Sequence, residues 1–151
     1  MRLLDGHLTV ADLDELLATL DDVAEATGTT VQAFDADYVV SADHLQRAVE
    51  RADRAIARGE NVARDRAVEI LCYAAGRRQI NRALEMGVSE GRNRVVVLVD
   101  SAAGDETAEA EGIAALREEV EEADVLGEYD EQTVRAFFDV TPAELDVVEG
   151  T

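Results

Sequence analysis

The sequence predicts an α+β fold, a single compact helix-rich domain with a small mixed β-sheet that spans residues 1–151. Several segments carry apolar residues at spacings of three and four, which is the period of a helix buried on one face. The run from Val95 to Val99 is apolar without interruption and is typical of a strand covered on both faces. At this length one domain with its own core is expected, and neither an internal repeat nor a low-complexity linker divides the chain.

The N-terminal segment predicts a short strand followed by an amphipathic helix. Arg2–Leu8 is apolar enough for a strand, although Asp5-Gly6 interrupts it and suggests a turn or a short bulged edge. Thr9 is expected to begin the helix, with Asp12 at the capping-box position, and Gly28 to end it.

Two short strands and a longer helix are expected next. Thr30–Phe34 and Tyr38–Val40 read as strands on either side of a turn, paired with the N-terminal strand. Ser41 is a favourable N-cap for a helix that runs to Arg58 and ends at Gly59. Its expected core stripe is Leu45, Ala48, Val49, Ala52 and Ile56.

Residues 61–87 predict two helices that meet in a tight corner. Asn61 is expected to cap the first, which ends near Gly76, and the second runs from Arg77 to Met86 and ends at Gly87. The expected inward residues are Ala67, Ile70, Leu71 and Ala74 in the first helix and Ile80, Ala83 and Leu84 in the second.

The C-terminal third predicts one strand, the valine run, among helices. A polar loop at 89–94 is expected before this strand and a turn at 101–105 after it, followed by a very acidic helix to about residue 122. In that helix Ile113, Leu116 and Val120 are expected to face inward. Asp130 is expected to cap the next helix, and a short last helix begins at the capping box Thr141-Pro142-Ala143-Glu144. The acidic side chains of 105–122 are expected to be a solvated face.

Composition predicts adaptation to molar salt. The chain has 14 arginines and no lysine, with 34 acidic residues and a formal net charge of -20. Such a surface holds water and hydrated cations, and the weakly hydrated guanidinium still makes bidentate contacts in brine. A GC-rich genome would explain the missing lysine but not the excess of acids. We therefore expect a halophilic source.

Motifs for catalysis and for membrane insertion are missing from the sequence. There is no glycine-rich phosphate loop with its lysine, no nucleotide fingerprint and no serine nucleophile elbow. One cysteine and two histidines leave no internal disulfide and no zinc set, so Cys72 is expected to be buried and His7 and His44 to be structural. We expect no enzyme, cofactor or metal. Without a leader or an 18-residue apolar run, a soluble cytoplasmic protein with no membrane contact is expected.

A basic island, residues 47–94, lies within an otherwise acidic chain. It holds 11 arginines against seven acidic residues and would receive a partner of opposite sign, such as RNA phosphate. Four of these arginines, Arg47, Arg51, Arg54 and Arg58, recur along one side of the helix expected at 41–58. Asp43 and Glu50 each precede one of them by four residues, so helix salt bridges are the alternative explanation for this stripe.

Arginine and amide side chains near helix starts form the candidate RNA-binding set, because such groups suit phosphate, sugar and exposed base edges. The candidates are Asn61, Arg64, Arg77, Arg78, Gln79, Asn81 and Arg82. Local ion pairing with Glu69, Glu85 and Glu90 is the alternative, and composition alone does not decide between the two.

Several short motifs occur together in a specific order. They are Ala42-Asp43-His44-Leu45, then Arg58-Gly59-Glu60-Asn61 leading to Glu69-Ile70-Leu71, then Arg78-Gln79-Ile80 before Gly87, followed by the valine strand and by Phe138 with Glu144-Leu145. With this order and spacing the chain resembles the PRPK-binding protein family, the small subunit of the KEOPS complex that binds its atypical kinase. A haloarchaeal source agrees with the resemblance. The acidic stretch 105–122 departs from the family pattern.

The resemblance implies a noncatalytic subunit of a complex that makes the threonylcarbamoyl modification on tRNA. Its expected partners are the kinase/ATPase subunit and the 3′ CCA end of tRNA, with no DNA. By this likeness the basic island would face tRNA, whereas Val134, Phe137 and Phe138 would face the kinase or simply lie in the core. Two other classes stay open: an adaptor that binds only proteins, and a small enzyme or metabolite-binding domain.

Overall fold

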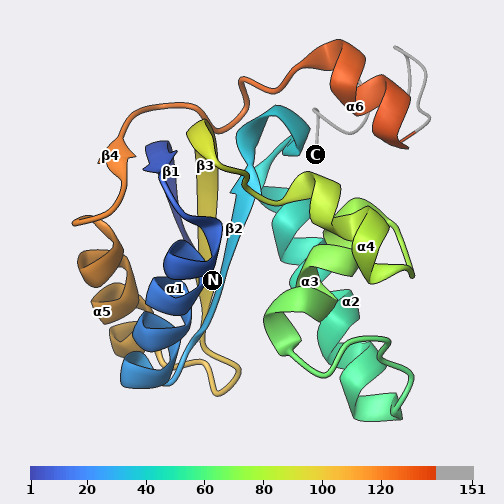
Figure 1. The fold of residues 1–151 in the computed structure, drawn as a ribbon. Helices are drawn as coiled ribbons and strands as arrows, with labels where there is room; N and C mark the ends of the chain where they lie inside the picture. Colours follow the sequence, from blue (N-terminus) through green and yellow to red (C-terminus); the bar gives the residue numbers. More distant parts are fainter. Residues whose placement is uncertain (139–151) are drawn as a thin grey trace.

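The computed structural model describes residues 1–138, and within them the expected α+β architecture is confirmed (Figure 1). The strands are β1 (Arg2–Val10), β2 (Thr30–Asp35), β3 (Gly91–Asp100) and β4 (Glu121–Glu122). They form one sheet in the order β2-β3-β1-β4. Every described pair is antiparallel, so the sheet is not mixed as the sequence suggested.

Helices cover both faces of the sheet (Figure 1). They are α1 (Leu13–Thr27), α2 (Ala42–Arg58), α3 (Arg66–Ala75), α4 (Ile80–Ala83), α5 (Glu106–Leu116) and α6 (Glu131–Phe138), with 3-10 turns η1 (Ala36–Tyr38) and η2 (Leu84–Met86). Helices α1 and α5 share one hydrophobic core with the sheet, and α2 and α3 share the other. The sheet is therefore the middle of three layers.

Strand β3 joins the two cores, as the valine run predicted. Val95, Val97 and Val99 belong to the core under α1 and α5, whereas Val96 and Leu98 belong to the core under α2 and α3. All five are fully buried because successive side chains of a strand alternate between its faces. Full burial of one such side chain stabilises the fold by about 1.5–3 kcal/mol.

Strand β1 is continuous, so the turn or bulged edge expected at Asp5-Gly6 is wrong. The strand lies between β3 and β4. Position 6 needs glycine because a Cβ there would come within 2.1 Å of the Glu121 carbonyl oxygen. Asp5 Oδ2 accepts the backbone N–H groups of Val125 and Leu126, both at 2.9 Å. Asp5 and Gly6 therefore hold the segment after α5 against the sheet instead of breaking the strand.

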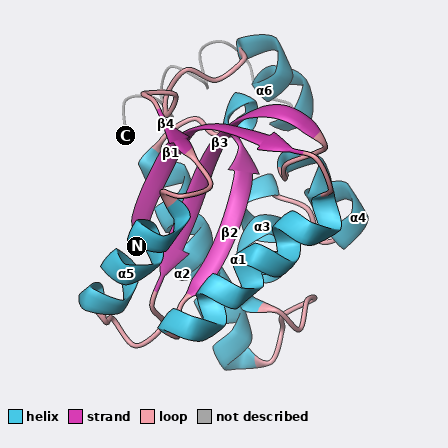
Figure 2. Cartoon of the chain, turned by 60° about the vertical axis from the view of Figure 1, so that its left-hand side comes forward, coloured by secondary structure: helices cyan, strands magenta, loops and turns pink. Residues whose placement is uncertain are grey.

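Strand β2 pairs with β3, so its expected pairing with the N-terminal strand is wrong. This places β2 at one edge of the sheet, where it is the outermost strand in Figure 2. Residues 38–40 form no strand. Tyr38 belongs to the 3-10 turn η1, which begins where the Asp35 side chain accepts the N–H of Asp37 at 2.9 Å and ends β2.

The C-terminal ends of α1, α2 and α3 are confirmed, because glycine takes the left-handed conformation there without a Cβ penalty. Gly28, Gly59 and Gly76 have φ values of 67°, 68° and 64° after α1, α2 and α3. The start of α2 is also confirmed, since Ser41 Oγ accepts the N–H of His44 at 3.2 Å.

Three elements begin at other residues than expected. Helix α1 is capped by Asp12 rather than Thr9, because Thr9 continues β1. Helix α3 is capped by Asp65 rather than Asn61, because the chain runs on as a loop after α2 before it turns back. Strand β3 begins at Gly91, within the polar loop expected before the valine run, since β1 is long enough to pair with it there.

The helix expected at 77–86 is shorter than the sequence suggested. It consists of the single turn α4 followed by the 3-10 turn η2, and this change of helix type moves the buried face. Ile80 and Leu84, expected inward, are 39% and 55% exposed, whereas Ala83 and Met86 are buried.

Two further burial expectations are wrong. Ile56 is 40% exposed, and the alanine before it lies in the core of α2 instead. The acidic helix ends at Leu116, and its acids are not all solvated. Glu109 is only 4% exposed, and its Oε2 accepts the N–H of Ser101 at 2.8 Å.

Helix α6 begins as expected, with Asp130 Oδ1 accepting the N–H of Thr133 at 2.9 Å. The last helix, expected from Thr141, lies outside the described residues. No helix among residues 1–138 is both long and apolar enough to cross a membrane.

Candidate functional site

The turn after α3 positions the first arginines of the candidate site. The N–H groups of Gly76 and Arg77 donate to the carbonyls of Tyr73 and Cys72, at 3.2 and 3.0 Å. These bonds end α3 and turn the chain toward α4. Arg77 and Arg78 therefore lie at the C-terminal end of α3.

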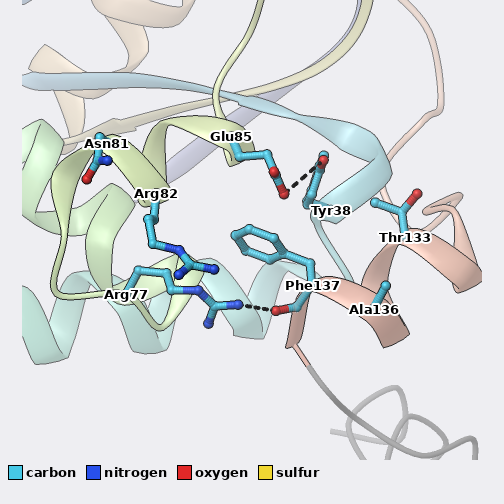
Figure 3. A pocket seen from close by; sticks show the side chains of 8 residues that line it. All are labelled: Tyr38, Arg77, Asn81, Arg82, Glu85, Thr133, Ala136 and Phe137. Carbon is cyan, nitrogen blue, oxygen red and sulfur yellow. Dashed lines mark hydrogen bonds between the residues drawn. The ribbon is translucent and has the colours of Figure 1, made fainter.

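A pocket of about 460 Å³, the α4–α6 pocket, opens beside this turn (Figure 3). It brings three predicted RNA-binding residues together with Phe137, which the resemblance had assigned to a protein partner. The lining residues are Tyr38, Arg77, Asn81, Arg82, Glu85, Thr133, Ala136 and Phe137.

Arg77 is held against α6. Its Nη2 donates to the Phe137 carbonyl, and its guanidinium carbon lies 4.6 Å from the centre of the Phe137 ring. This ring meets those of Tyr38 and Phe138 edge to face, with centroid distances of 5.1 and 4.9 Å. Aromatic pairs of this kind contribute about 0.5–1.5 kcal/mol each beyond their burial. The contacts fix α6 on the α3–α4 turn and place a guanidinium group over an aromatic face.

The other polar groups of the pocket differ in charge. The Tyr38 hydroxyl donates to Glu85 Oε2 at 3.5 Å, and burial and the Glu85 charge raise the pKa of Tyr38, which keeps it a neutral donor. Arg82 extends toward Arg77 and Phe137 in Figure 3. Guanidinium groups can bind phosphate, while a carboxylate can accept the amino hydrogens of a base.

Two further hollows adjoin this pocket around the α3–α4 turn. One, of about 250 Å³, is lined by Arg51, Tyr73, Arg77 and Arg78 among others. The next, of about 330 Å³, shares Arg51 and Tyr73 with it and reaches Phe138. Each of the three hollows therefore combines arginine with an aromatic ring, and together we call them the arginine–aromatic surface.

Some arginines of the basic island form ion pairs within the described residues, but those at the α3–α4 corner do not. Within residues 1–138, no carboxylate lies within ion-pair distance of Arg77, Arg78 or Arg82. The paired arginines include Arg47 with Asp43, Arg66 with Asp53 and Asp100, and Arg94 with Asp37 and Glu128.

The salt-bridge explanation for the stripe on α2 is correct at one of its two positions. Arg47 Nε lies 2.8 Å from Asp43 Oδ2, as that explanation predicts. Glu50 instead accepts the side-chain amide of Gln46 at 3.5 Å, and no ion pair with Arg54 forms within the described residues. Within the described residues, Arg78, Arg82 and the rest of the stripe thus have no carboxylate partner.

His44 is structural, as the sequence suggested. Its Nε2 lies 2.8 Å from the Ala74 carbonyl, and its Nδ1 accepts the N–H of Val40 at 3.4 Å. Burial lowers the pKa of His44, although the bond to Ala74 opposes this shift. The neutral ring thus links the start of α2 to the end of α3. Cys72 is also buried, and burial raises the pKa of its thiol.

Three of the predicted RNA-binding residues lie outside the arginine–aromatic surface. Asn61, Arg64 and Gln79 line none of its three hollows. Asn61 donates to the carbonyl of Ala63 at 2.8 Å. Arg64 precedes α3, at the opposite end of that helix from Arg77, and Gln79 precedes α4 without a capping bond from its side chain.

The residues assigned to a protein partner differ in accessibility. Val134 is only 1% exposed and packs on Val40, so its side chain belongs to the core. Phe137 and Phe138 are half-buried against the core under α2 and α3. Direct contact of these two with a partner stays a prediction.

Sequence reasoning missed Tyr38, Tyr73 and Glu85. The two tyrosines could have been chosen as candidates because the chain has few aromatic residues, only three tyrosines and three phenylalanines. Four of these six, Tyr38, Tyr73, Phe137 and Phe138, line the arginine–aromatic surface. Glu85 had been assigned to local ion pairing with the arginines.

The fold and the site define a small α+β binding protein, with helices on both faces of an antiparallel sheet and a surface of arginine and aromatic side chains at one end. Among residues 1–138, no group of three His, Cys, Asp or Glu side chains is arranged to hold a metal ion. The chain belongs to the family described as kinase binding protein CGI-121, whose model matches residues 9–151. This match supports the kinase-binding family inferred from the motifs and a kinase as partner. No curated protein matches the chain.

Proposed function

We propose that this protein is the noncatalytic kinase-binding subunit of a KEOPS-type tRNA-modification complex, and that its arginine–aromatic surface binds the single-stranded 3′ CCA end of tRNA. Membership in a kinase-binding family supports the first part. One observation carries the second: four of the six aromatic residues line three adjoining hollows, and each hollow also contains arginine.

This combination suits a single strand better than a duplex. Bases of a single strand are splayed out, so they stack on aromatic rings and guanidinium planes, at about 1–3 kcal/mol per base. The Phe137 ring beneath Arg77 prepares such a platform, and the carboxylate of Glu85 can accept the amino group of a cytosine or an adenine. Arg78 and Arg82 can then contact the phosphates between the bases.

A cytoplasm of molar salt, which the composition predicts, restricts how RNA is recognised. At about 1 M salt the screening length is about 3 Å, so long-range attraction to phosphate is lost. Stacking and short hydrogen bonds persist. The proposed site therefore relies on arginine, which stacks and binds in a bidentate way, and the absence of lysine from the chain fits this requirement.

The test is the affinity of the protein for labelled tRNA in molar KCl, measured with intact tRNA and with tRNA that lacks its 3′ CCA. Intact tRNA should bind more tightly. The double variant Arg78→Ala/Arg82→Ala should weaken binding at least about tenfold, since each lost contact costs roughly 1 kcal/mol or more. Arg117→Ala is the matched control, because this exposed arginine pairs with Glu122 far from the corner.

Equal affinity for both tRNAs, or equal loss in the double variant and in the control, would refute the RNA part of the proposal. Recovery of a kinase without tRNA, from cells of a halophilic archaeon washed in molar KCl, would leave an adaptor that binds only proteins. One observation favours that second function: Arg77 Nη2 already donates to the Phe137 carbonyl, so this donor is not free for RNA.

A further inference from the structure

The α4–α6 pocket stands at one end of the arginine–aromatic surface. It shares Arg77 with the hollow of about 250 Å³, and that hollow shares Arg51 and Tyr73 with the one of about 330 Å³. The first and third hollows have no described lining residue in common. The three hollows therefore follow one another in a row, and a strand that runs through them places an end nucleotide in the α4–α6 pocket.

Two chemically different walls enclose this pocket on either side of Phe137 (Figure 3). Arg77 and Arg82 form one wall, and the guanidinium carbon of Arg77 lies 4.6 Å from the centre of the Phe137 ring. The other wall holds Tyr38, whose ring centre lies 5.1 Å from that of Phe137, and Glu85, which accepts the tyrosine hydroxyl at 3.5 Å. The pocket thus has cationic donors on one side and a carboxylate on the other.

Glu85 has no cation beside it in the described part of the chain. The sequence had suggested that it pairs with nearby arginines, yet within residues 1–138 no arginine lies within ion-pair distance of it. The acids that line the other two hollows are engaged, since Asp43 pairs with Arg47 and Glu69 accepts two backbone N–H groups through Oε1. Among these residues Glu85 accepts one hydrogen bond, through Oε2, so its carboxylate keeps capacity for further donors.

A carboxylate in a pocket lined by arginines restricts what can enter. It accepts hydrogen bonds and donates none, so a phosphate pressed against it would lose water without gaining a donor. The ribose at the 3′ end of an RNA meets this restriction, because it has a phosphate on its 5′ side alone and two free hydroxyls that can donate. Carboxylates bind ribose hydroxyls in dinucleotide-binding proteins. These effects act at contact distance, so they persist in molar salt, where long-range attraction does not.

We propose that the α4–α6 pocket binds the terminal nucleotide of the tRNA 3′ end, and that Glu85 accepts hydrogen bonds from its 2′- and 3′-hydroxyls. Arg82 then contacts the 5′ phosphate of this nucleotide, while its base stacks beside the arginine–phenylalanine pair. The pocket volume of about 460 Å³ lies within the range of about 300–1,000 Å³ that is typical of small-molecule sites.

This inference rests on the proposed RNA function and adds the chemical state of the end that the site requires. The amino group of a base is another donor that Glu85 can accept, but all three bases of CCA offer one. The pair of free hydroxyls occurs only at the last nucleotide, which matches the place of the pocket at the end of the row. The site therefore selects tRNA whose 3′ end is complete and carries neither a phosphate nor an acyl group.

The test measures how the full chain binds three forms of one tRNA in molar KCl: with an unmodified terminal adenosine, with 3′-deoxyadenosine, and with a 3′-phosphate. The deoxy end should bind about tenfold more weakly, because it loses one hydrogen bond to a charged group, and the phosphate end should be weakened at least as much. Glu85→Gln changes an exposed side chain of nearly the same size, and its amide can donate to a phosphate. This variant should bind the phosphate end and the unmodified end about equally.

Glu111→Gln is the matched control, since Glu111 is exposed on α5 and should leave both differences in affinity unchanged. A general loss of stability would weaken all three ends alike, so it cannot imitate the expected result. The inference is overturned if the protein binds the three ends equally, or if Glu85→Gln discriminates between them as the control does. The proposed RNA function survives both results as long as tRNA without CCA binds more weakly, whereas equal binding with and without CCA would refute that function and this inference together.

Discussion

Glu69 is a buried acid on which we base a detailed prediction. It is 1% exposed, and its Oε1 accepts the N–H groups of Val62 and Ala63 at 3.0 and 2.9 Å. The carboxylate thus holds the loop between α2 and α3 against α3. Val62 in turn lines one hollow of the arginine–aromatic surface.

Glu69→Ala should lower the free energy of unfolding by about 3 kcal/mol. Hydrogen bonds to a charged group contribute about 1.5–3 kcal/mol each, and removing the carboxylate also removes the cost of desolvating its charge, which offsets part of the loss. The buried N–H of Ala63 would also lose its partner. Glu69→Gln keeps an acceptor oxygen at nearly the same place but loses the charge, so about half of the loss is expected.

Urea unfolding at one fixed KCl concentration measures both values, with the denaturant slope expected to stay constant if the transition is two-state. A loss below about 0.5 kcal/mol for Glu69→Ala would refute the reasoning, because losses of that size are typical of surface substitutions. So would equal losses for the alanine and glutamine variants, since the charge of the carboxylate would then contribute nothing.

Three other predictions concern the sheet and His44. Gly6→Ala should cost about 1–3 kcal/mol in thermal unfolding, because its Cβ would lie 2.1 Å from the Glu121 carbonyl oxygen; a variant as stable as the original would show that β4 moves freely. Leu98→Ala should cost about 2–5 kcal/mol in urea unfolding, since the side chain is fully buried, and a smaller loss would contradict the packing described. Because burial lowers the pKa of His44 below 6.5, the unfolded state binds more protons, and stability should decrease as pH falls below 6.5 toward the lower folded-state pKa. A plot of stability against pH for His44→Gln should be flatter in that window, and an unchanged slope would exclude His44 as its cause.

Local signals in the sequence were sufficient to predict the C-terminal ends of α1, α2 and α3 and the buried part of β3. Gly28, Gly59 and Gly76 end helices because the left-handed conformation favours glycine wherever it occurs. The run from Val95 to Val99 predicted a strand because no solvent-facing position interrupts it. Family membership followed from ordered motifs, and the family match covers residues 9–151.

Helix starts were harder to predict because several residues could serve as caps. Thr9 and Asp12 are both good N-caps, and pairing of β1 with β3 decides between them by keeping Thr9 extended. Likewise Asn61 and Asp65 compete for α3, and the loop held by Glu69 excludes the first.

The candidate site could be predicted only in part. Arg77, Asn81 and Arg82 were found because charged and amide residues stand close together in the sequence. Tyr38 was not predicted as a site residue, because nothing in the sequence around it relates it to those three residues. Val134 shows the opposite error: an apolar residue of an amphipathic helix gives no sign of whether it faces the core or a partner.

By itself the sequence determined the helix periods, the left-handed glycine caps, the buried valine strand and the segregation of arginine into one stretch, because each depends on neighbouring residues. Only the tertiary structure decided the strand order and the assembly of the pocket, because both depend on contacts between distant segments. Arg77 and the carbonyl that it binds, that of Phe137, are 60 residues apart. Which rings meet which guanidinium groups follows from how the layers pack.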